Sequence, residues 1–543
     1  MAFGSRSRIL AATTAMVLVG SVFAGSPAYA GKPKPKPDPG NNTPAKLTKA
    51  MTTLGVLRHS AAFQFIADHN GDTRASGTPG FDKSAQYVEW TMRLAGYRVS
   101  TQEFPFVFCD ETSSSFAQTA PASTPYEDGV TYDLMQCSGS GDVTAAVVPV
   151  DLALDPPRAS SSGCEATDFD GVDVAGKIAL MQRGACNFSV KAQNAIDAGA
   201  VGVIIFNQGN GTREDNPDRY ELFGGNLGAA ISVPVVSVSF DLGVEFVNTA
   251  GLTVHLAAQT ISEERTTRNV IAETPGGNAD NVVMMGAHLD SVPAGPGIND
   301  DGSGSAALLE LAWQMRKVKP KNKVRFAWWG AEEGGSLGST HYINELTEEQ
   351  AAQIKLYLNY DMIASPNYTL ATFDGDDSDA TGAGPGPLGS AEIEKAFEAF
   401  FASRHAPLKG TDFDGRSDYG GFIAIGIPAG GLFTGAEDPK TADDVAKWGG
   451  VVGAQLDPCY HQACDSLTPV ADGADAELYR QLDRQYPMVG NLNLRALDIN
   501  IDAMATVAIT YAFDTSSIPD RTAATARTAA RTAVGNVPAA RTS

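Results

Sequence analysis

The sequence predicts an α/β protein with a mixed, mostly parallel sheet flanked by helices and interrupted by a β-rich insertion. Two observations support this fold class. From Arg268 onward, apolar strand-like runs alternate with helix-like segments, as in parallel sheets covered by helices. Between residues 130 and 262, short β-rich runs with glycine turns break that alternation. A chain of 543 residues has room for two or three domains.

The first 30 residues have the pattern of a secretory signal peptide. Arg6 and Arg8 precede an apolar run over residues 9–24, and residues 28–30 (AYA) have the small residues of a cleavage site. The run is short for a membrane span, and no other stretch is expected to cross a bilayer. We therefore expect a secreted, extracellular chain that starts near Gly31, with a retained anchor as the alternative.

Two low-complexity segments flank the predicted folded part. Residues 31–46 are rich in Pro and Lys and predict an extended linker. Residues 515–543 are rich in Ala, Thr and Arg, have little to bury, and predict a disordered or removed tail. The α/β domain is then expected to comprise residues 47–129 and 263–514.

The elements follow from periodicity. In FDKSAQYVEWTMRLAGY, Ala85, Val88, Met92 and Ala95 share one helical face, and Gly96 ends the helix. The insertion contains five strand-like runs, TAAVVPV, GKIALMQRG, VGVIIFN, VPVVSVS and LTVHLAA, and one helix-like run, SVKAQNAIDAGA. The later part contains the strands NVVMMGAH, KVRFAWWGAEE and IKLYLNYDM, with a helix over residues 303–315 after the first.

Charge and cysteine content restrict the environment and the partners. The chain has 40 Lys and Arg against 63 Asp and Glu, a net charge of −23, which argues against nucleic acid or an anionic membrane as a partner. Six cysteines behind a signal peptide predict disulfides, for which many pairings are possible. We favour pairing between neighbours: Cys109 with Cys137, Cys164 with Cys186, and Cys459 with Cys464.

Acidic and histidine side chains follow the predicted strands. His288, Glu332, Glu333 and Asp361 each come directly after an apolar run, and Asp300 lies in the glycine-rich loop before the next helix. The carboxyl ends of neighbouring parallel strands meet at one edge of a sheet, where ligands bind. We therefore expect these side chains to converge, although a single His next to Asp, or a Glu pair, is more often structural or solvated.

Converging carboxylates need cations if they are buried. Two Zn²⁺ ions would balance three carboxylates and a bridging hydroxide, and Mn²⁺ or Co²⁺ are alternatives for mixed imidazole and carboxylate ligands. His461, between Cys459 and Cys464 in DPCYHQACD, supplies a second imidazole. Such a pair of ions both generates a nucleophile and stabilises an oxyanion. No HExxH, GxSxG or EF-hand pattern is present, and we interpret the other five histidines as ordinary.

The same segments resemble a known family. GAHLDSVPAGPGINDDGSGSAALLE, FAWWGAEEGGSLGS, YLNYDMIASPN, GRSDYGGF, GGLFTGAE and DPCYHQACDSL resemble, in this order, the secreted dizinc aminopeptidases of peptidase family M28. The resemblance covers about residues 47–108 and 265–513 and implies a zinc-exopeptidase fold. DVAGKIALMQRGACNFSVKAQNAIDAGAVGVIIFNQ resembles a protease-associated (PA) domain, so residues 130–262 are expected to be an inserted PA domain.

The resemblance implies a set of metal ligands. His288 and Asp361 would bind one zinc, Glu333 and His461 the other, and Asp300 would bridge both. Calcium is not supported by the sequence.

It also implies roles around the metals. Glu332 would be the general base that passes a proton to the leaving amine. Tyr460 would hydrogen-bond the oxyanion. Asp290 would orient His288, and Arg416 would contact the substrate.

A pocket and a backbone feature complete the implied site. Met362, Gly415 and Phe433 would line a pocket for an apolar first residue, and the Asp300–Asp301 peptide bond is expected to be cis.

The expected function is that of a monomeric, secreted, zinc-dependent aminopeptidase. It would use a metal-bridging hydroxide to remove large apolar, Leu-like residues from peptides with a free N-terminus, and would bind neither nucleic acid nor membrane. The alternatives are a dizinc carboxypeptidase or aminoacylase on a similar scaffold, or a catalytically inert binding protein that uses its PA domain.

Overall fold

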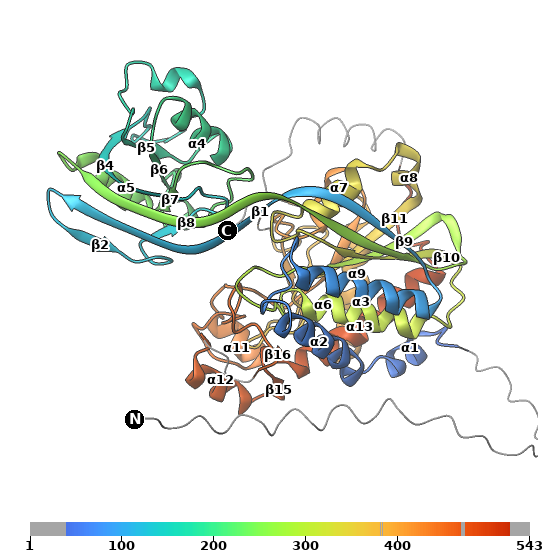
Figure 1. Ribbon diagram of the computed structural model, residues 1–543. Coiled ribbons are helices and arrows are strands. Elements are labelled where there is room, and N and C mark those ends of the chain that lie inside the picture. Colours follow the sequence, from blue (N-terminus) through green and yellow to red (C-terminus); the bar gives the residue numbers. More distant parts are fainter. Residues whose placement is uncertain (1–39, 215, 381, 383, 469–472, 522–543) are drawn as a thin grey trace, which may run out of the picture. The chain divides into compact units, whose positions relative to one another are not determined.

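The computed structural model in Figure 1 describes residues 40–214, 216–380, 382, 384–468 and 473–521. The predicted signal peptide, linker residues 31–39 and the tail from residue 522 lie outside the described residues. The described ends of the two low-complexity segments differ from the prediction: helix α1 (Pro44–Ala50) begins inside the predicted linker, and Ile518, in the predicted tail, is buried in the core of the α/β part. The described chain from Asn41 onward forms one compact unit.

The predicted α/β half of the sheet is mixed and mostly parallel. Its strands are β9 (Asn278–His288), β10 (Asn322–Trp329), β11 (Ile354–Tyr360), β12 (Ala371–Phe373), β13 (Lys409–Thr411) and β14 (Ala429–Phe433). β14, β11, β9 and β10 are parallel neighbours in this order, β12 is antiparallel to β14, and β13 is parallel to β12. The predicted fold class is confirmed.

Side chains from these strands fill two cores, one on each face of the sheet. On β10, Phe326 and Trp328 pack on one face, whereas Ala327 and Trp329 pack on the other. Alternation of this kind follows from the two-residue period of a strand. Both faces are buried, as expected for parallel strands between helices.

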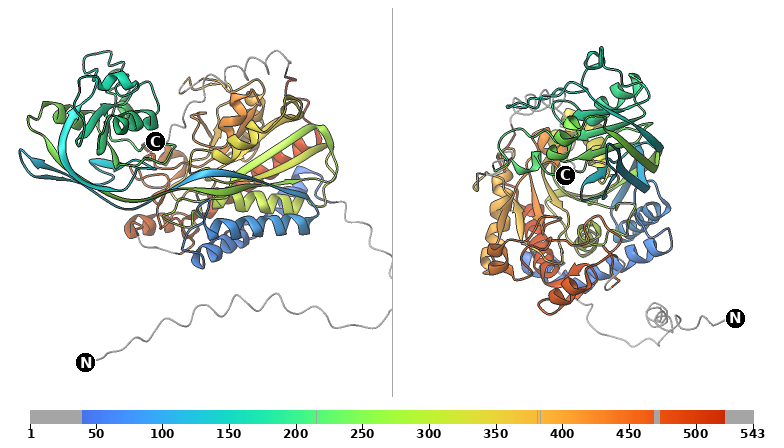
Figure 2. Two further views of the ribbon diagram at one scale, coloured as in Figure 1. Left: turned by 45° about the horizontal axis from the view of Figure 1, so that its top comes forward. Right: turned by 90° about the vertical axis from the view of Figure 1, so that its left-hand side faces the viewer.

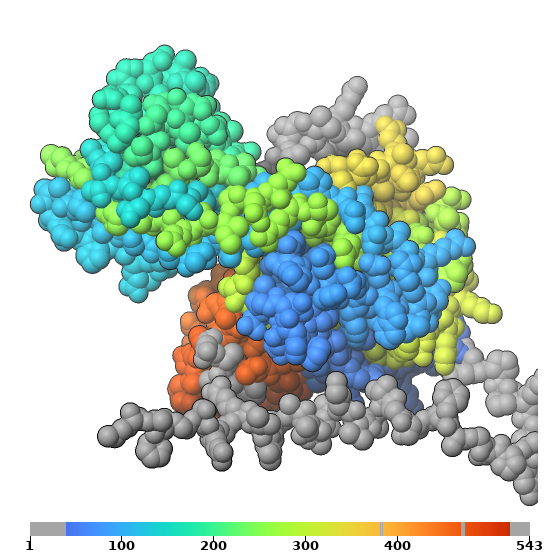
Figure 3. All heavy atoms as spheres, viewed as in Figure 1, coloured from blue at the N-terminus to red at the C-terminus, as the bar shows by residue number. Residues whose placement is uncertain are grey.

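Helices cover both faces. The described α-helices are α1 (Pro44–Ala50), α2 (Thr53–Asp68), α3 (Pro79–Ala95), α4 (Phe188–Asp197), α5 (Phe240–Asn248), α6 (Gly302–Met315), α7 (Leu337–Asn344), α8 (Glu348–Gln353), α9 (Ser390–Ser403), α10 (Tyr419–Ala424), α11 (Ala442–Trp448), α12 (Ala476–Asp483) and α13 (Leu494–Phe513). α6 packs against β9, β10 and β11, with α2, α3 and α13 around it. On the face in Figure 3, the blue N-terminal helices form much of the surface over this core.

Two helices show how the sequence sets their positions. The predicted helix over Ala85, Val88 and Met92 is α3; all three side chains are buried, and Gly96 ends it with a left-handed φ of 88°. α6 is buried from its first turn, and a Cβ on Gly304 would lie 2.0 Å from the Tyr360 carbonyl oxygen. This close approach brings the start of α6 against the end of β11.

A long antiparallel ribbon joins the two parts of the sheet. β1 (Arg98–Ala120) and β8 (Thr253–Glu273) pair from Arg98↔Glu273 to Ala120↔Thr253. Figures 1 and 2 show the two strands running side by side from the helix-covered part into the insertion. Beyond the ribbon, β10 pairs with β8 on the α/β side and β4 pairs with β8 on the inserted side.

The insertion contains the predicted strands and one further helix. Its other strands are β2 (Thr124–Tyr126), β3 (Tyr132–Leu134), β4 (Gly141–Pro149), β5 (Ile178–Gln182), β6 (Gly202–Phe206) and β7 (Val235–Val238). α4 is the predicted helix, whereas α5, a helix of 9 residues, was not predicted. Two 3₁₀ turns, Ala166–Phe169 and Pro217–Arg219, and the hairpin of β15 (Met488–Val489) and β16 (Leu492–Asn493) complete the described elements.

Within the ribbon of β1 and β8, the side chains pass from the core of the α/β part to the core of the insertion. Phe116 and Tyr126 pack in the core of the insertion together with Val254 and Leu256. Val270 packs in the core of the α/β part. Residues before the predicted junction at 129/130 thus already belong to the packing of the insertion. Because β1 has no turn within it, the sequence gives no sign of where along the strand the packing changes from one core to the other.

Three disulfides connect neighbouring cysteines. Cys109 is bonded to Cys137, Cys164 to Cys186, and Cys459 to Cys464. The favoured pairing is confirmed.

One helix of the described residues, α13, is long and apolar enough to span a membrane by length and composition alone. Contrary to the sequence-based expectation, a second spanning candidate thus exists by this measure. However, 67% of its most apolar window is buried, and Leu497, Ile501 and Met504 pack in the α/β core. We interpret α13 as a core helix.

Candidate active site

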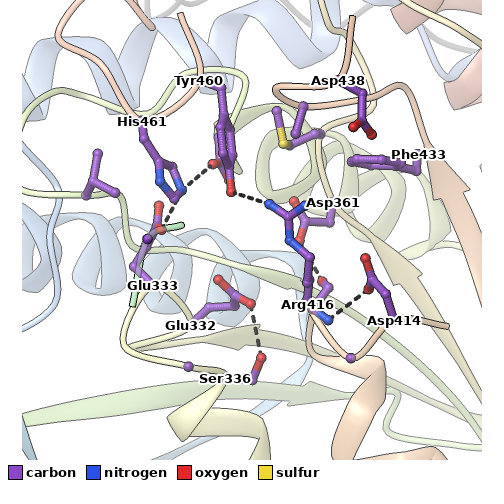
Figure 4. Close-up of a pocket in the computed structure, with 18 of the residues that line it drawn as sticks. Glu332, Glu333, Ser336, Asp361, Asp414, Arg416, Phe433, Asp438, Tyr460 and His461 are labelled. Atoms are coloured by element: carbon purple, nitrogen blue, oxygen red, sulfur yellow. Dashed lines mark hydrogen bonds and ion pairs between the residues drawn. The ribbon is translucent and has the colours of Figure 1, made fainter. Parts of the chain in front are cut away.

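The predicted site residues meet at the carboxyl ends of the central strands. His288 is the last residue of β9, Glu332 and Glu333 follow β10, and Asp361 directly follows β11. Asp300 lies just before α6. They line one pocket with Tyr460 and His461 or lie directly beside it (Figure 4).

The Asp300 carboxylate lies between the two predicted histidine ligands. Its Oδ1 is 3.1 Å from His288 Nε2, and its Oδ2 is 3.4 Å from His461 Nε2. Asp361 Oδ1 is 3.6 Å from the same nitrogen of His288, and Glu333 Oε2 is 3.1 Å from His461 Nε2. All five predicted ligands are therefore together, arranged as two groups that share one carboxylate.

Asp301 approaches the same cluster but differs in its bonding. Its ligand atoms lie within 4.8 Å of those of His288 and Asp361. However, Asp301 Oδ2 accepts a hydrogen bond from the backbone N–H of His288, and Oδ1 accepts from those of Gly304 and Met362. Asp301 therefore ties three backbone segments together. The Asp300–Asp301 peptide bond is cis, as the resemblance implies.

The donor set fits divalent metal ions. Glu333 Oε1 is buried without a hydrogen-bond partner among the described residues, which is costly for a carboxylate oxygen unless a ligand completes it. Burial alone would lower the pKa of His288, but Asp361, Asp290 and Asp300 outweigh burial and raise it well above its usual value. An environment that favours a proton on a buried imidazole also favours a cation. Imidazole with carboxylate suits zinc.

Glu332 lies beside the ligands without joining them. Its Oε1 accepts a hydrogen bond from Ser336 Oγ at 3.0 Å, and its Oε2 is 3.9 Å from His288 Nε2. Burial, opposed in part by His288 and reinforced by nearby carboxylates, raises the pKa of Glu332 well above its usual value. A carboxyl group with a raised pKa is suited to accept and return a proton.

Asp290 holds both the ligand histidine and the Glu332 loop. Its carbonyl oxygen is 3.2 Å from His288 Nδ1, and its carboxylate Oδ1 is 3.7 Å from the same nitrogen. Oδ1 also accepts the backbone N–H of Glu332 at 3.2 Å. This position agrees with the orienting role that the resemblance implies.

Other supporting residues were not predicted. Ser417 Oγ donates to Asp361 Oδ2 at 2.6 Å and accepts from Asn359 Nδ2 at 2.8 Å. Asp465 accepts the backbone N–H groups of Asn299 and Asp300, at 2.8 and 2.9 Å. Both residues lie within motifs noted in the sequence, GRSDYGGF and DPCYHQACDSL, and their proximity to predicted ligands was the only signal available.

Arg416 contacts Tyr460 and a glutamate. Its guanidinium donates to the Tyr460 hydroxyl oxygen at 3.2 Å (Figure 4). It also pairs with Glu437 at 2.8 Å. Tyr460 also stacks on His461, with ring centroids 3.8 Å apart. Because Arg416 donates to the phenol oxygen, the phenol hydrogen is free to point to another acceptor. Arg416 thus lies where it supports Tyr460, in addition to lining the pocket.

The pocket walls come from both parts of the molecule. The predicted residues Met362, Gly415 and Phe433 line it. The insertion contributes residues that sequence reasoning did not select: Asp133, Leu134, Gln136, Gly224 and Gly225.

Comparisons with known proteins match both parts of the chain. The model of peptidase family M28 matches residues 269–482, and the PA domain model matches residues 143–246. An aminopeptidase of Pseudomonas aeruginosa strain PAO1 is 45% identical over 486 residues, covering 89% of this chain and 85% of that protein. A probable lipoprotein aminopeptidase of Mycobacterium tuberculosis is 43% identical, covering 78% and 81%. Leucine aminopeptidase 2 of Trichophyton rubrum is 44% identical, covering 58% and 62%.

Solved structures show the same fold. The aminopeptidase from Aneurinibacillus sp. strain AM-1 matches with a TM-score of 0.63 and 25% identity, covering 88% of this chain and 98% of that one. A zinc aminopeptidase from Bacillus subtilis matches in fold with a TM-score of 0.52 and 22% identity, covering 83% and 94%.

Proposed function

The chain belongs to peptidase family M28 and is an aminopeptidase with an inserted PA domain; from this premise, we propose that it is a secreted, zinc-dependent enzyme that removes large apolar, Leu-like residues from the N-terminus of peptides. The main support is the placement of two imidazoles, from His288 and His461, on opposite oxygens of the Asp300 carboxylate. Such an arrangement would form two adjacent metal sites that share the Asp300 carboxylate.

In the proposed centre, His288 and Asp361 would hold one zinc, Glu333 and His461 would hold a second, and Asp300 would be a ligand of both. When bound, the two ions supply Lewis acidity that activates water and polarises the scissile carbonyl.

Glu332 is the proposed general base. It takes a proton from the attacking water and returns it to the leaving amine, so the carboxyl group ends the cycle as it began. The Ser336 hydroxyl fixes one oxygen of Glu332 and leaves the other facing the cluster.

Tyr460 is the proposed donor to the oxyanion. Burial raises the pKa of its phenol well above the usual value, so the group keeps its proton at neutral pH. Arg416 donates to the phenol oxygen, which leaves the phenol hydrogen available for the oxyanion. A fixed donor in a buried site favours the transition state without reorganisation.

The proposed substrate preference rests on the pocket lining and on the relatives. Met362 and Phe433 offer apolar surface next to Gly415, and the carboxylates of Glu332 and Asp361 can accept hydrogen bonds from the free N-terminal amine. Relatives that match over more than half of this chain are named leucine aminopeptidases. Three disulfides agree with an extracellular destination.

Kinetics with Leu-p-nitroanilide and an N-blocked dipeptide test the proposal. We expect cleavage of the anilide, loss of activity with a chelator, and recovery with Zn²⁺. Faster cleavage of Leu than of Ala, Glu or Lys anilides is expected from the apolar lining. Cleavage of the blocked dipeptide alone would contradict aminopeptidase specificity and favour the carboxypeptidase or aminoacylase alternative.

A further inference from the structure

Two amide side chains of the insertion reach the loop that carries Glu333. Gln136 Nε2 donates to the backbone carbonyl of Glu333 at 3.3 Å, and Asn226 Nδ2 donates to that of Gly334 at 3.2 Å. The partners are far apart in the chain, by 197 and 108 residues. The insertion therefore bonds directly to the loop of a proposed metal ligand.

Both amides are fixed on the side of the insertion. Gln136 and Asn226 form a β-bridge, in which the Gln136 N–H donates to Gly225 and the Gln136 carbonyl accepts from Leu227, at 2.8 and 3.0 Å. Asn226 Oδ1 accepts the N–H of Gly228 at 2.7 Å, which orients the amide with Nδ2 toward the Glu333 loop.

A disulfide also anchors the segment that carries Gln136. Cys137, next to Gln136, is bonded to Cys109 on β1. β1 also runs through the α/β sheet, because its Arg98 end pairs with β8 next to β10. The two amides are thus anchored to the domain whose loop they contact.

The Glu333 side chain has few other restraints. Its Oε2 faces His461 at 3.1 Å, and its Oε1 is buried without a partner among the described residues. The loop itself is irregular: Ala331 and Ser336 have φ angles of 54° and 53°, and the Glu332 carbonyl accepts from both Gly335 and Ser336. The position of this carboxylate therefore depends on where the loop backbone is held.

We propose that Gln136 and Asn226 are positioning residues for Glu333, so that the PA domain is part of the metal centre of the peptidase domain. The proposal rests on the proposed function, since it takes Glu333 as a ligand. Residues that hold a ligand in place commonly change metal affinity by ~10- to 100-fold. We expect loss of the two amide bonds to weaken the Glu333–His461 site and to leave the His288–Asp361 site unchanged.

Two variants remove the donors in different ways. Gln136→Met keeps the length of the side chain and removes its N–H groups. Asn226→Asp keeps the oxygen that accepts from Gly228 and replaces the donor with a second oxygen. The added negative charge would strengthen cation binding if charge alone mattered, so weaker binding in both variants isolates the positional effect.

Titration of the metal-free full chain with Zn²⁺ against a competing chelator gives both dissociation constants. We expect one of the two constants to rise about tenfold in each variant and further in the double variant, and the other to change less than twofold. His461→Ala identifies the affected site, because it removes a ligand of the Glu333–His461 site. In a chain that already carries His461→Ala, adding Gln136→Met should weaken zinc binding at that site no further, because the effects of coupled residues are not additive.

Gln208→Met is the matched control. Gln208 Nε2 donates to the Arg158 carbonyl at 3.0 Å within the insertion, so this change removes a similar bond away from the site. Thermal unfolding of the metal-free proteins establishes that each variant is folded. Equal weakening of both sites, an unchanged pair of constants, or the same shift in Gln208→Met would overturn the proposal. Failure of the unaltered protein to bind Zn²⁺ would instead refute the proposed function.

Discussion

Strands of the α/β part and of the PA domain both end in buried polar residues, but these residues differ in how they are satisfied. In the α/β part, β9, β10 and β11 lead into His288, Glu332, Glu333 and Asp361, and Glu333 has a buried oxygen with no partner among the described residues. In the PA domain, β5 ends at the fully buried Gln182, whose amide bonds both backbone groups of Ala153.

Asn207, which follows β6, also has hydrogen-bond partners within the chain for both ends of its side-chain amide. Its Nδ2 donates to the carbonyls of Asp218 and Glu221, at 2.7 and 2.8 Å, and its Oδ1 accepts from the N–H of Gln208. A buried polar residue that the chain satisfies by itself holds structure, whereas one that the chain leaves incomplete points to a ligand. The same place in a strand, its carboxyl end, thus serves stability in one domain and chemistry in the other.

The largest expected effect is at the base. Glu332→Gln removes the proton acceptor and keeps the shape of the side chain, so kcat should fall by ~10²- to 10⁴-fold. Bound zinc should stay unchanged, because Glu332 is not among the proposed ligands. Steady-state kinetics and metal analysis measure both. Glu349→Gln, at an exposed position on α8, is the matched control and should behave as the unaltered protein. An unchanged kcat in Glu332→Gln would remove the residue from its proposed role.

The corresponding change in the PA domain should affect stability and spare the chemistry. Gln182→Met removes the hydrogen bonds that this buried amide makes to the N–H and carbonyl of the half-buried Ala153 and to the carbonyl of Gln208, which we expect to cost about 2–3 kcal/mol of unfolding free energy. Denaturant unfolding measures the loss. Zinc affinity and kcat should stay within twofold of the unaltered protein. A large fall in zinc affinity with little loss of stability would abolish the contrast between the two domains.

Disulfides extend the comparison. Cys164–Cys186 closes a loop of 22 residues in the PA domain, and Cys459–Cys464 closes one of 5 next to His461. Loop entropy predicts losses of about 3 and about 2 kcal/mol on replacing each pair by serine. Removal of Cys459–Cys464 should in addition weaken zinc binding, since the loop positions a proposed ligand. Parallel unfolding and zinc titrations test this; equal zinc affinity in both variants would contradict it.

The smallest expected effect concerns Asp133 of the PA domain. Burial, with the nearby charges of Asp128 and Glu111, raises its pKa to about 7. Since the folded pKa lies above the unfolded one, ionisation disfavours the folded state, and stability falls as pH rises from about 4 to about 7. Asp133→Asn should raise Tm by ~4 °C at pH 8 and leave it unchanged near pH 4. Scanning calorimetry at both pH values measures this. An equal gain at the two values would show that the charge is not responsible.

Sequence reasoning predicted the residues of the α/β site because each belongs to a local pattern. His288, Glu333 and Asp361 follow apolar runs, and the parallel sheet brings strand ends together without further information. The disulfide pairing followed the same local logic. Their roles as ligands and base stay predictions.

Contacts between distant segments left no such pattern. Ser417, Gln136 and Asn226 act through one or two side-chain hydrogen bonds to segments far along the chain, and neutral polar residues of this kind are common in loops. The ribbon was missed for a related reason: β1 keeps one backbone conformation while its side chains pass from one core to the next. The alternation of side chains along a strand shows which residues share a face of the sheet. It does not show which core that face packs against.

The pairing of β1 with β8 also bears on how such a chain arises. Phe108 and Glu263 are direct partners on the two strands, so the PA domain leaves and rejoins the peptidase domain at neighbouring points. A tight turn can close two antiparallel strands at such a rung. An insertion or deletion at this one rung would therefore add or remove the whole module without breaking the α/β sheet. Loss of the PA domain would also remove the Gln136 and Asn226 amides. A chain without this domain would therefore need other contacts to hold its Glu333 loop in place.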